Sequence, residues 1–146
     1  MISRVYPQFH LSALSGQVNL ATDQLRVLLL SSGYVPNLDT HRYQSSLTNE
    51  LATGGGYTAG GKILTGVSLA YDSATDTTWL DAANPVWDPS TITSRFAVLV
   101  DTQSGAAATN PLVAFWDFEE DKASDNAPFE LNINALGLVR VTANPA

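Results

Sequence analysis

The feature that most constrains the fold is a rapid succession of short apolar stretches, each closed by residues that favour turns. Turns are predicted at 72–76, 84–85, 88–90, 105–111 and 121–128. Spacing this short leaves little chain for helices, so the sequence predicts an all-β protein, an antiparallel β-sandwich or jelly roll. The stretches that carry the strand pattern are 24–31, 62–72, 78–83, 91–101, 111–119, 129–133 and 136–143.

Two of these stretches differ in pattern. Residues 24–31, QLRVLLLS, form a continuous apolar run, which is typical of a fully buried strand. Residues 62–72 alternate instead, which predicts a single strand with one apolar face. The residues predicted on that face are Ile63, Thr65, Val67, Leu69 and Tyr71.

One short helix is predicted within residues 39–52, with Asp39 or Thr40 as its N-cap. Leu47 and Leu51 are at helical spacing with Tyr43, although the β-branched and hydroxyl residues around them limit the helix to one or two turns. The segment 1–15 fits either an N-terminal arm or a strand. With 146 residues and no break in composition, 16–146 is expected to form a single β-sandwich domain.

The charge pattern excludes several classes of partner. The formal net charge is −7, and the basic residues are scattered, so no basic surface for nucleic acid or an anionic membrane is predicted. Only 14% of residues are charged, which suits a surface that packs against neighbouring proteins. Pro7, Gln8 and His10 interrupt the apolar stretch that a signal peptide needs, and synthesis in the cytoplasm is expected.

A glycine-rich stretch resembles a phosphate-binding loop only in part. From Gly56 the chain reads G-x-x-x-x-G-K, but Ile63 stands where the Mg²⁺-binding Ser or Thr belongs. The residues after Lys62 have a strand pattern, whereas the phosphate loop requires a helix there. These glycines are therefore predicted to form a turn with positive φ before a strand, and Asp101 to end a strand rather than to hold a metal.

No catalytic, cofactor-binding or metal-binding residue is predicted. The acidic cluster at 117–125 lacks the glycine and the terminal glutamate of a calcium loop. His10 and His41 have no ligand spacing, no G-x-S-x-G motif occurs, and the chain contains no cysteine. A hydrolase would need a cleft that holds a carboxylate of raised pKa, and no motif points to one.

The tryptophans Trp79, Trp87 and Trp116 all fall in predicted strands. Core packing is the common use of such side chains, while stacking of sugar rings is the alternative. A glycan-binding module would require Trp79 or Trp116 to be exposed beside polar residues.

Four blocks of the chain together resemble a family of small virion proteins of tailed bacteriophages. The resemblance covers about residues 20–122, and GYTAGG and STITSRFAV are its most specific parts. The blocks are YVPNLDTHRYQSSLTNE, GGGYTAGGKILTGVSLAYD, ANPVWDPSTITSRFAVLVD and NPLVAFWDFEEDK. Within that family the chain is most similar to the capsid cement or decoration proteins.

This resemblance implies a non-enzymatic protein without cofactors, a homo-oligomer (dimer or trimer) that binds the major capsid protein on the outer surface of the head. Another virion position, in the tail or fibre base, is the alternative to the head. Segments 5–14 and 33–43 combine aromatic, Pro and Leu residues with weak strand patterns and are expected to reach neighbouring subunits. The predicted contact residues are Val5, Tyr6, Phe9, Leu11, Tyr34, Val35, Pro36 and Tyr43.

Overall fold

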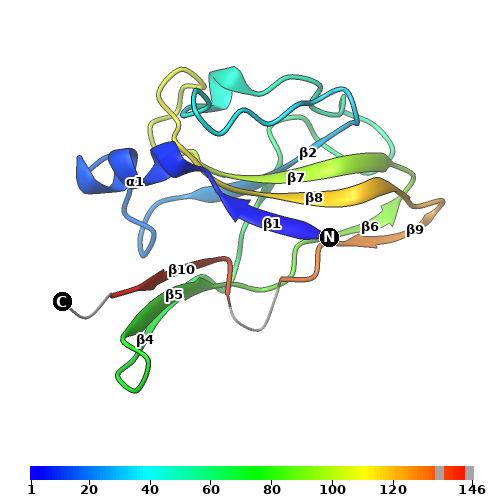
Figure 1. Cartoon of the computed structure of the whole chain (residues 1–146). Coiled ribbons are helices and arrows are strands. Elements are labelled where there is room, and N and C mark those ends of the chain that lie inside the picture. Colours follow the sequence, from blue (N-terminus) through cyan, green and yellow to red (C-terminus); the bar gives the residue numbers. More distant parts are fainter. Residues whose placement is uncertain (134–136, 144–146) are drawn as a thin grey trace.

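The computed structural model describes residues 1–133 and 137–143, and its largest element is a five-stranded antiparallel sheet (Figure 1). Its three central strands are β8, β7 and β2, which correspond to the predicted strands 111–119, 91–101 and 24–31. In spatial order the strands are β1 (Ile2–Val5), β8 (Leu112–Ala123), β7 (Thr93–Asp101), β2 (Leu25–Leu30) and β3 (Lys62–Ile63).

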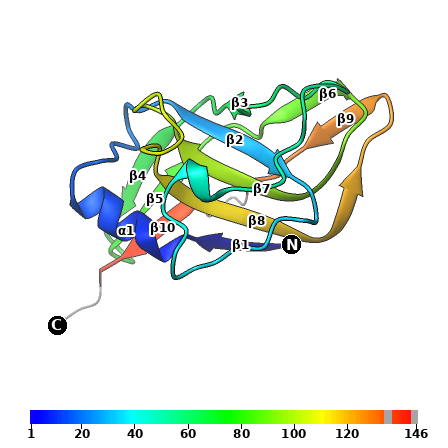
Figure 2. The ribbon, with the colours of Figure 1, turned by 90° about the horizontal axis from the view of Figure 1, so that it is seen from above.

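Two smaller antiparallel sheets form a second layer under the first. Figure 1 shows them below the five-stranded sheet, and the view from above in Figure 2 places them toward opposite ends. One sheet has the order β10 (Val139–Thr142), β5 (Thr77–Asp81), β4 (Ser68–Asp72), and the other pairs β6 (Val86–Ser90) with β9 (Ala127–Glu130). The predicted all-β, sandwich-like architecture is confirmed.

The core lies around the central strands, which are covered on both faces. The long segment 31–61 lies over the upper face of the five-stranded sheet, and the second layer covers much of the lower one (Figure 1). The apolar side chains of Val27–Leu30 and Val98–Val100 are consequently buried. Burial on both faces explains why β2 reads as a continuous apolar run rather than as an alternating one.

The predicted position of the helix is wrong. Residues 39–52 contain only a single 3₁₀ turn, η1 (Gln44–Ser46), because the segment bonds to other parts of the chain instead of to itself. The Leu51 N–H donates to the Leu29 carbonyl, which joins this segment to β2. The α-helix is α1 (Pro7–Leu14), where Pro7 occupies a first-turn position that needs no N–H.

The N-terminal segment is an integral part of the fold. Residues 2–5 form the strand β1, which pairs antiparallel with β8, but residues 7–14 form the helix α1, which neither alternative for 1–15 included. Tyr6 and Phe9 are both buried in the core. Removing residues 1–15 would therefore take away two core side chains and expose the edge of β8.

The predicted strand 62–72 is two strands, β3 and β4. The chain leaves the extended conformation between them, where Gly66 has a φ of 64°. The predicted apolar face does not form a core face either: Ile63, Leu69 and Tyr71 are all exposed. Alternation predicted a half-buried strand here, but the inner face of the β4–β5–β10 sheet is only partly covered.

Two further boundaries differ from the prediction. β6 occupies residues 86–90, where Pro89 and its neighbours predicted a turn, and its pairing with β9 shifts register between Trp87 and Ser90. This irregularity accommodates a proline in an edge strand. β8 runs on to Ala123 through residues predicted to turn, because the start of β7 pairs with Lys122 and Ala123.

The glycine-rich stretch forms the predicted turn. Gly54, Gly55 and Gly56 all have positive φ, as do Gly60 and Gly61, and Lys62 then begins a strand. This part of the prediction is confirmed, and the helix that a phosphate loop needs is not formed by these residues. Across residues 1–133 and 137–143, no helix has the length and apolar character needed to cross a membrane.

Candidate interaction surface

The most prominent hollow is an apolar groove between α1 and the β4–β5–β10 sheet, with a volume of about 740 Å³. We call it the open groove. One wall comes from α1 and the loop that follows it, and the other from the small sheet. Its apolar side chains are Phe9, Ala13, Leu14, Val18, Leu20, Leu69, Trp79, Leu80, Val139 and Val141.

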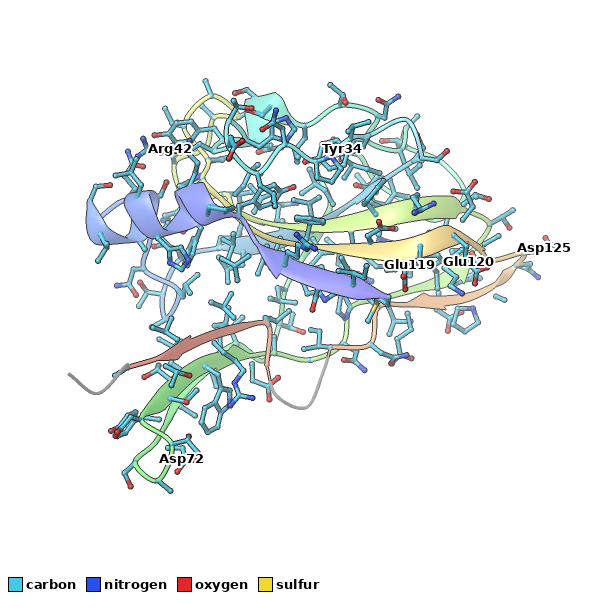
Figure 3. All side chains as sticks on the ribbon, in the orientation of Figure 1. Tyr34, Arg42, Asp72, Glu119, Glu120 and Asp125 are labelled. Atoms are coloured by element: carbon cyan, nitrogen blue, oxygen red, sulfur yellow. The ribbon has the colours of Figure 1, made fainter. Side chains whose placement is uncertain are left out.

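The helical wall of the open groove is fixed in place by the rest of the fold. Phe9 anchors α1 in the core, and buried Ser12 accepts a hydrogen bond from the Arg42 Nε at 3.1 Å. Arg42 also donates to the Gln17 side chain at 3.0 Å (Arg42 is labelled in Figure 3). Leu14, which ends the helix, is 89% exposed at the rim of the groove.

The sheet wall of the groove is made by rows of residues across three strands. Leu69 of β4 and Val139 of β10 flank Leu80 of β5, and Tyr71 and Val141 flank Thr78 in the next row. Leu80 and Val139 are buried, whereas Leu69 and Val141 are exposed. The row of Tyr71, Thr78 and Val141 lies farther from the core. It therefore presents apolar side chains that the described residues leave uncovered.

The opposite end of the second layer is closed by aromatic side chains. Trp87 of β6 lies 6.2 Å from Tyr57 and 6.1 Å from Phe129, measured between ring centroids. Phe129 in turn lies 6.1 Å from Phe118 of β8. Edge-on and tilted rings at these distances fill space well. The two layers are thus packed together at the β6–β9 end and parted at the open groove.

The open groove has no charged residue among those that line it; its polar side chains are His10, Asn19 and Thr78. Several acidic residues lie far from it. Figure 3 shows Glu119, Glu120 and Asp125 at the end of the molecule opposite α1. In a chain of net charge −7, an uncharged hollow favours an apolar partner over an ionic one.

A second hollow, of about 560 Å³, lies between the end of β8 and β9 and is lined by both apolar and charged residues. Its charged groups are largely paired with one another. Glu119 accepts from the Met1 amino group, and Glu120 accepts from Lys122. Asp117, beside this hollow, is paired with Arg95 at 2.6 Å, and this contact lowers the pKa of Asp117. Within the described ranges, no three His, Asp or Glu residues are grouped to hold a metal ion.

The predicted contact residues are divided between the core and the surface. Leu11 and Val35 are exposed and remain available for contact. Val5, Pro36 and Tyr43 are half-buried. The aromatic rings of Tyr6 and Tyr34 are enclosed in the core and cannot reach another subunit, which corrects the expectation for these two, whereas the buried ring of Phe9 lines the open groove.

The buried tyrosines form a hydrogen-bonded chain instead. The Tyr6 and Tyr34 hydroxyls are 2.7 Å apart, and the Tyr34 hydroxyl lies 2.9 Å from Nδ1 of His41. The Asn37 N–H also points to this Nδ1, at 3.3 Å. Burial raises the pKa of both tyrosines and lowers the pKa of His41, so all three groups are neutral at pH 7.

Sequence reasoning did not find the open groove. Two features of the sequence could have indicated it. Leu14 is an apolar residue at the end of the helix, and Leu69 and Tyr71 alternate like residues of a buried face although the core does not cover them. Trp87 and Trp116 are buried in the core, and only Trp79 reaches the groove. Searches of protein-family models, curated proteins and solved structures found no match to the chain.

Proposed function

We propose that the protein is a non-enzymatic virion protein of a tailed bacteriophage, a cement or decoration protein that binds the outer surface of the head. The resemblance of residues 20–122 to such proteins suggests this role, and the open groove is the observation that supports it. The groove would take an apolar segment of the major capsid protein, with Leu14, Leu69 and Val141 as the contacts at its rim.

The physical basis is burial of apolar surface repeated over a lattice. Full burial of a Leu or Val side chain contributes roughly 1.5–3 kcal/mol, so a few such contacts give only moderate affinity for one subunit. A homo-oligomer that engages several capsid subunits at once gains further affinity through effective concentration. Stabilisation of the head then follows, because each bound oligomer links subunits that would otherwise separate.

Glycan binding is less well supported. Sugar recognition needs an exposed aromatic ring together with several polar groups that bond to hydroxyls, and the groove combines Trp79 with a largely apolar wall. A tail or fibre-base protein could use the same groove, and only its location in the particle distinguishes that role from a head protein.

The test is to add the purified protein to heads that lack it, and to image and heat the particles. We expect ordered extra density on the outer surface and a higher temperature of disruption. Leu14→Asp should weaken this binding on the order of tenfold or more, because it places a charge at the apolar rim. Leu14 is exposed in the free chain, so this variant should keep its thermal stability.

Two comparison variants locate the contact. Ile63→Asp also replaces an exposed aliphatic residue with Asp, but outside the groove, and this variant should bind heads normally. Val35→Asp tests the contact expected in segment 33–43. If Val35→Asp abolishes binding while Leu14→Asp does not, the groove is not the contact surface. Failure of the unmodified protein to bind heads would contradict the decoration role, and a tail assay and a glycan array would follow.

A further inference from the structure

The free edges of the three sheets are not protected equally. Edge strands expose unpaired backbone groups, and proteins usually guard them with charged residues, above all Lys, or with Pro. Of the six edge strands within residues 1–133 and 137–143, five carry Lys, Arg or Pro, and β4 carries only the acidic Asp72 at its end. The guarding residues are Arg4 in β1, Lys62 in β3, Pro89 in β6, Pro128 in β9 and Arg140 in β10.

β4 is exposed as well as unguarded. Its backbone pairs with β5 on one side, and on the other side it pairs with no strand of the described residues. Leu69 is 47% exposed and Tyr71 is 62% exposed, both on the face that continues the open groove. The β4–β5 hairpin lies at the lower margin of the molecule, away from the five-stranded sheet (Figure 1).

We propose that β4 pairs antiparallel with β4 of a second copy of this chain, about a two-fold axis that passes through Ala70. Among the two-fold registers, only this one pairs all five residues of the strand, Ser68–Asp72. The β4–β5–β10 sheets of the two copies then join into one sheet of six strands with the order β10-β5-β4-β4-β5-β10. The contact is isologous, so the assembly closes at a dimer and does not extend into a filament.

The side chains of β4 are complementary to themselves in this register. Leu69 lies opposite Tyr71 of the second copy, and the same pair recurs across the axis, so the most exposed apolar side chains of the strand cover each other. Aromatic–aliphatic pairs directly opposite each other stabilise antiparallel sheets. Ser68 lies opposite Asp72, so no two charges of the same sign face each other.

Ala70 at the axis and Asp72 at the end of the strand are also compatible with this pairing. Ala70 is the smallest apolar side chain of β4, so the two copies can approach closely at the axis. The Asp72 carboxylate already accepts hydrogen bonds from the Ala74 N–H and the Thr75 hydroxyl, which lower its pKa. Its charge is therefore held at the hairpin turn, at the end of the paired segment.

This inference does not depend on the proposed function, because it concerns the purified chain alone. Sedimentation of the protein over a range of concentrations should show a dimer. Leu69→Glu or Tyr71→Lys alone should raise the dissociation constant on the order of tenfold or more, since each places an unpaired charge against an apolar residue. The double variant, Leu69→Glu with Tyr71→Lys, should recover much of the lost affinity, because the register sets each new acid opposite a new base.

Cross-linking tests the register itself. The chain has no cysteine, so a single Ala70→Cys substitution can form only an intermolecular disulfide. Directly opposed residues have Cβ atoms about 4.5–5.5 Å apart, close to what a disulfide requires. Ala70→Cys should oxidise rapidly to a covalent dimer. Val35→Cys, which is more exposed but lies outside β4, should do so slowly.

Each contrary result overturns the proposal. If the chain stays monomeric at high concentration, β4 does not pair with itself. The β4 edge then pairs with a strand of another protein or stays unpaired. A dimer that tolerates both single charged variants, and in which Ala70→Cys does not cross-link, uses another surface. Circular dichroism and thermal melting of every variant show whether the loss of dimer is a loss of fold. Binding to heads is measured separately, with Leu14→Asp, so the two proposals fail independently.

Discussion

Asp101 is the one acidic or basic side chain that the described residues bury almost completely; it is 1% exposed. Its Oδ1 accepts the Gln103 N–H at 3.0 Å, and its Oδ2 has no hydrogen-bond donor among these residues. Burial raises the pKa of Asp101 to about 7, and the nearby carboxyl group of Asp23 adds to this effect. Asp101 is not among the residues that line the open groove or the second hollow.

This carboxyl group makes stability depend on pH in a defined direction. The unfolded chain releases the proton near pH 4, whereas the folded chain holds it up to about pH 7. The free energy of unfolding should therefore fall as pH rises from 4 to 8, by on the order of 4 kcal/mol. Asp101→Asn should remove this fall, because the amide can donate to Asp23 at any pH.

The measurement is urea denaturation at a series of pH values. The amide variant should be the more stable protein at pH 8 and lose its advantage at pH 4. A wild-type protein whose stability rises steadily between pH 6 and 8 would contradict the assignment. Burial lowers the pKa of His41, so this group makes the free energy of unfolding rise with pH over an overlapping range, and the Asp101→Asn variant separates the two effects.

Sequence reasoning placed Asp101 correctly at the end of a strand but could not show its protonation. That state depends on Asp23, which belongs to the turn before β2 and comes close only because Leu25 pairs with Asp101. The same limit applies to Tyr6 and Tyr34. Their rings looked suited to contact with another subunit, and the fold instead joins their hydroxyls inside the core.

At the scale of elements, the turn at 54–61 shows where backbone geometry requires glycine. Gly55 has a φ of 58°, and a Cβ atom there would lie 2.2 Å from the carbonyl oxygen of Thr91. Gly55→Ala should therefore destabilise the protein by roughly 2–4 kcal/mol, since the link between β6 and β7 that carries Thr91 must move. Thermal melting or urea denaturation measures the loss.

Gly60 provides the matched control for this change. It also has positive φ, at 95°, but a Cβ atom there would meet no atom within 4 Å. Gly60→Ala should cost only the strain of the backbone, roughly 1 kcal/mol. Equal losses for the two variants would show that close packing at Gly55 has no role of its own.

The elements predicted best are those in which local pattern and burial agree. β2, β7 and β8 have long apolar runs, and all three were predicted near their observed limits except for the end of β8, which runs on to Ala123. The helix was placed wrongly because helical spacing at Tyr43, Leu47 and Leu51 competed with pairing to β2, which no local pattern shows. β6 was missed because Pro89 favours a turn in isolation and an irregular edge strand in this sheet.

At the scale of the whole molecule, the sequence predicted the layered β architecture but not how well the layers fit. Apolar residues at 69, 71 and 141 have the same local pattern as core residues, and only the assembled fold shows them exposed. The aromatic cluster around Trp87 closes one end of the second layer, while the other end is the open groove. How deeply a side chain is buried depends on segments that are distant in the sequence. The local pattern of apolar residues therefore does not predict it.

The separate strand pairing of the β4–β5–β10 sheet has a consequence for motion. This sheet shares no strand with the five-stranded sheet, so it can open by losing side-chain contacts alone, without breaking the central hydrogen-bond ladder. Its amide hydrogens should exchange with deuterium faster than those of β7 and β8, and a partner bound at the groove or at β4 should slow that exchange selectively. Equal protection in both sheets would instead mean that the molecule opens as one cooperative unit. A partner would then bind an already ordered surface, and no part of the binding free energy would be used to order the chain.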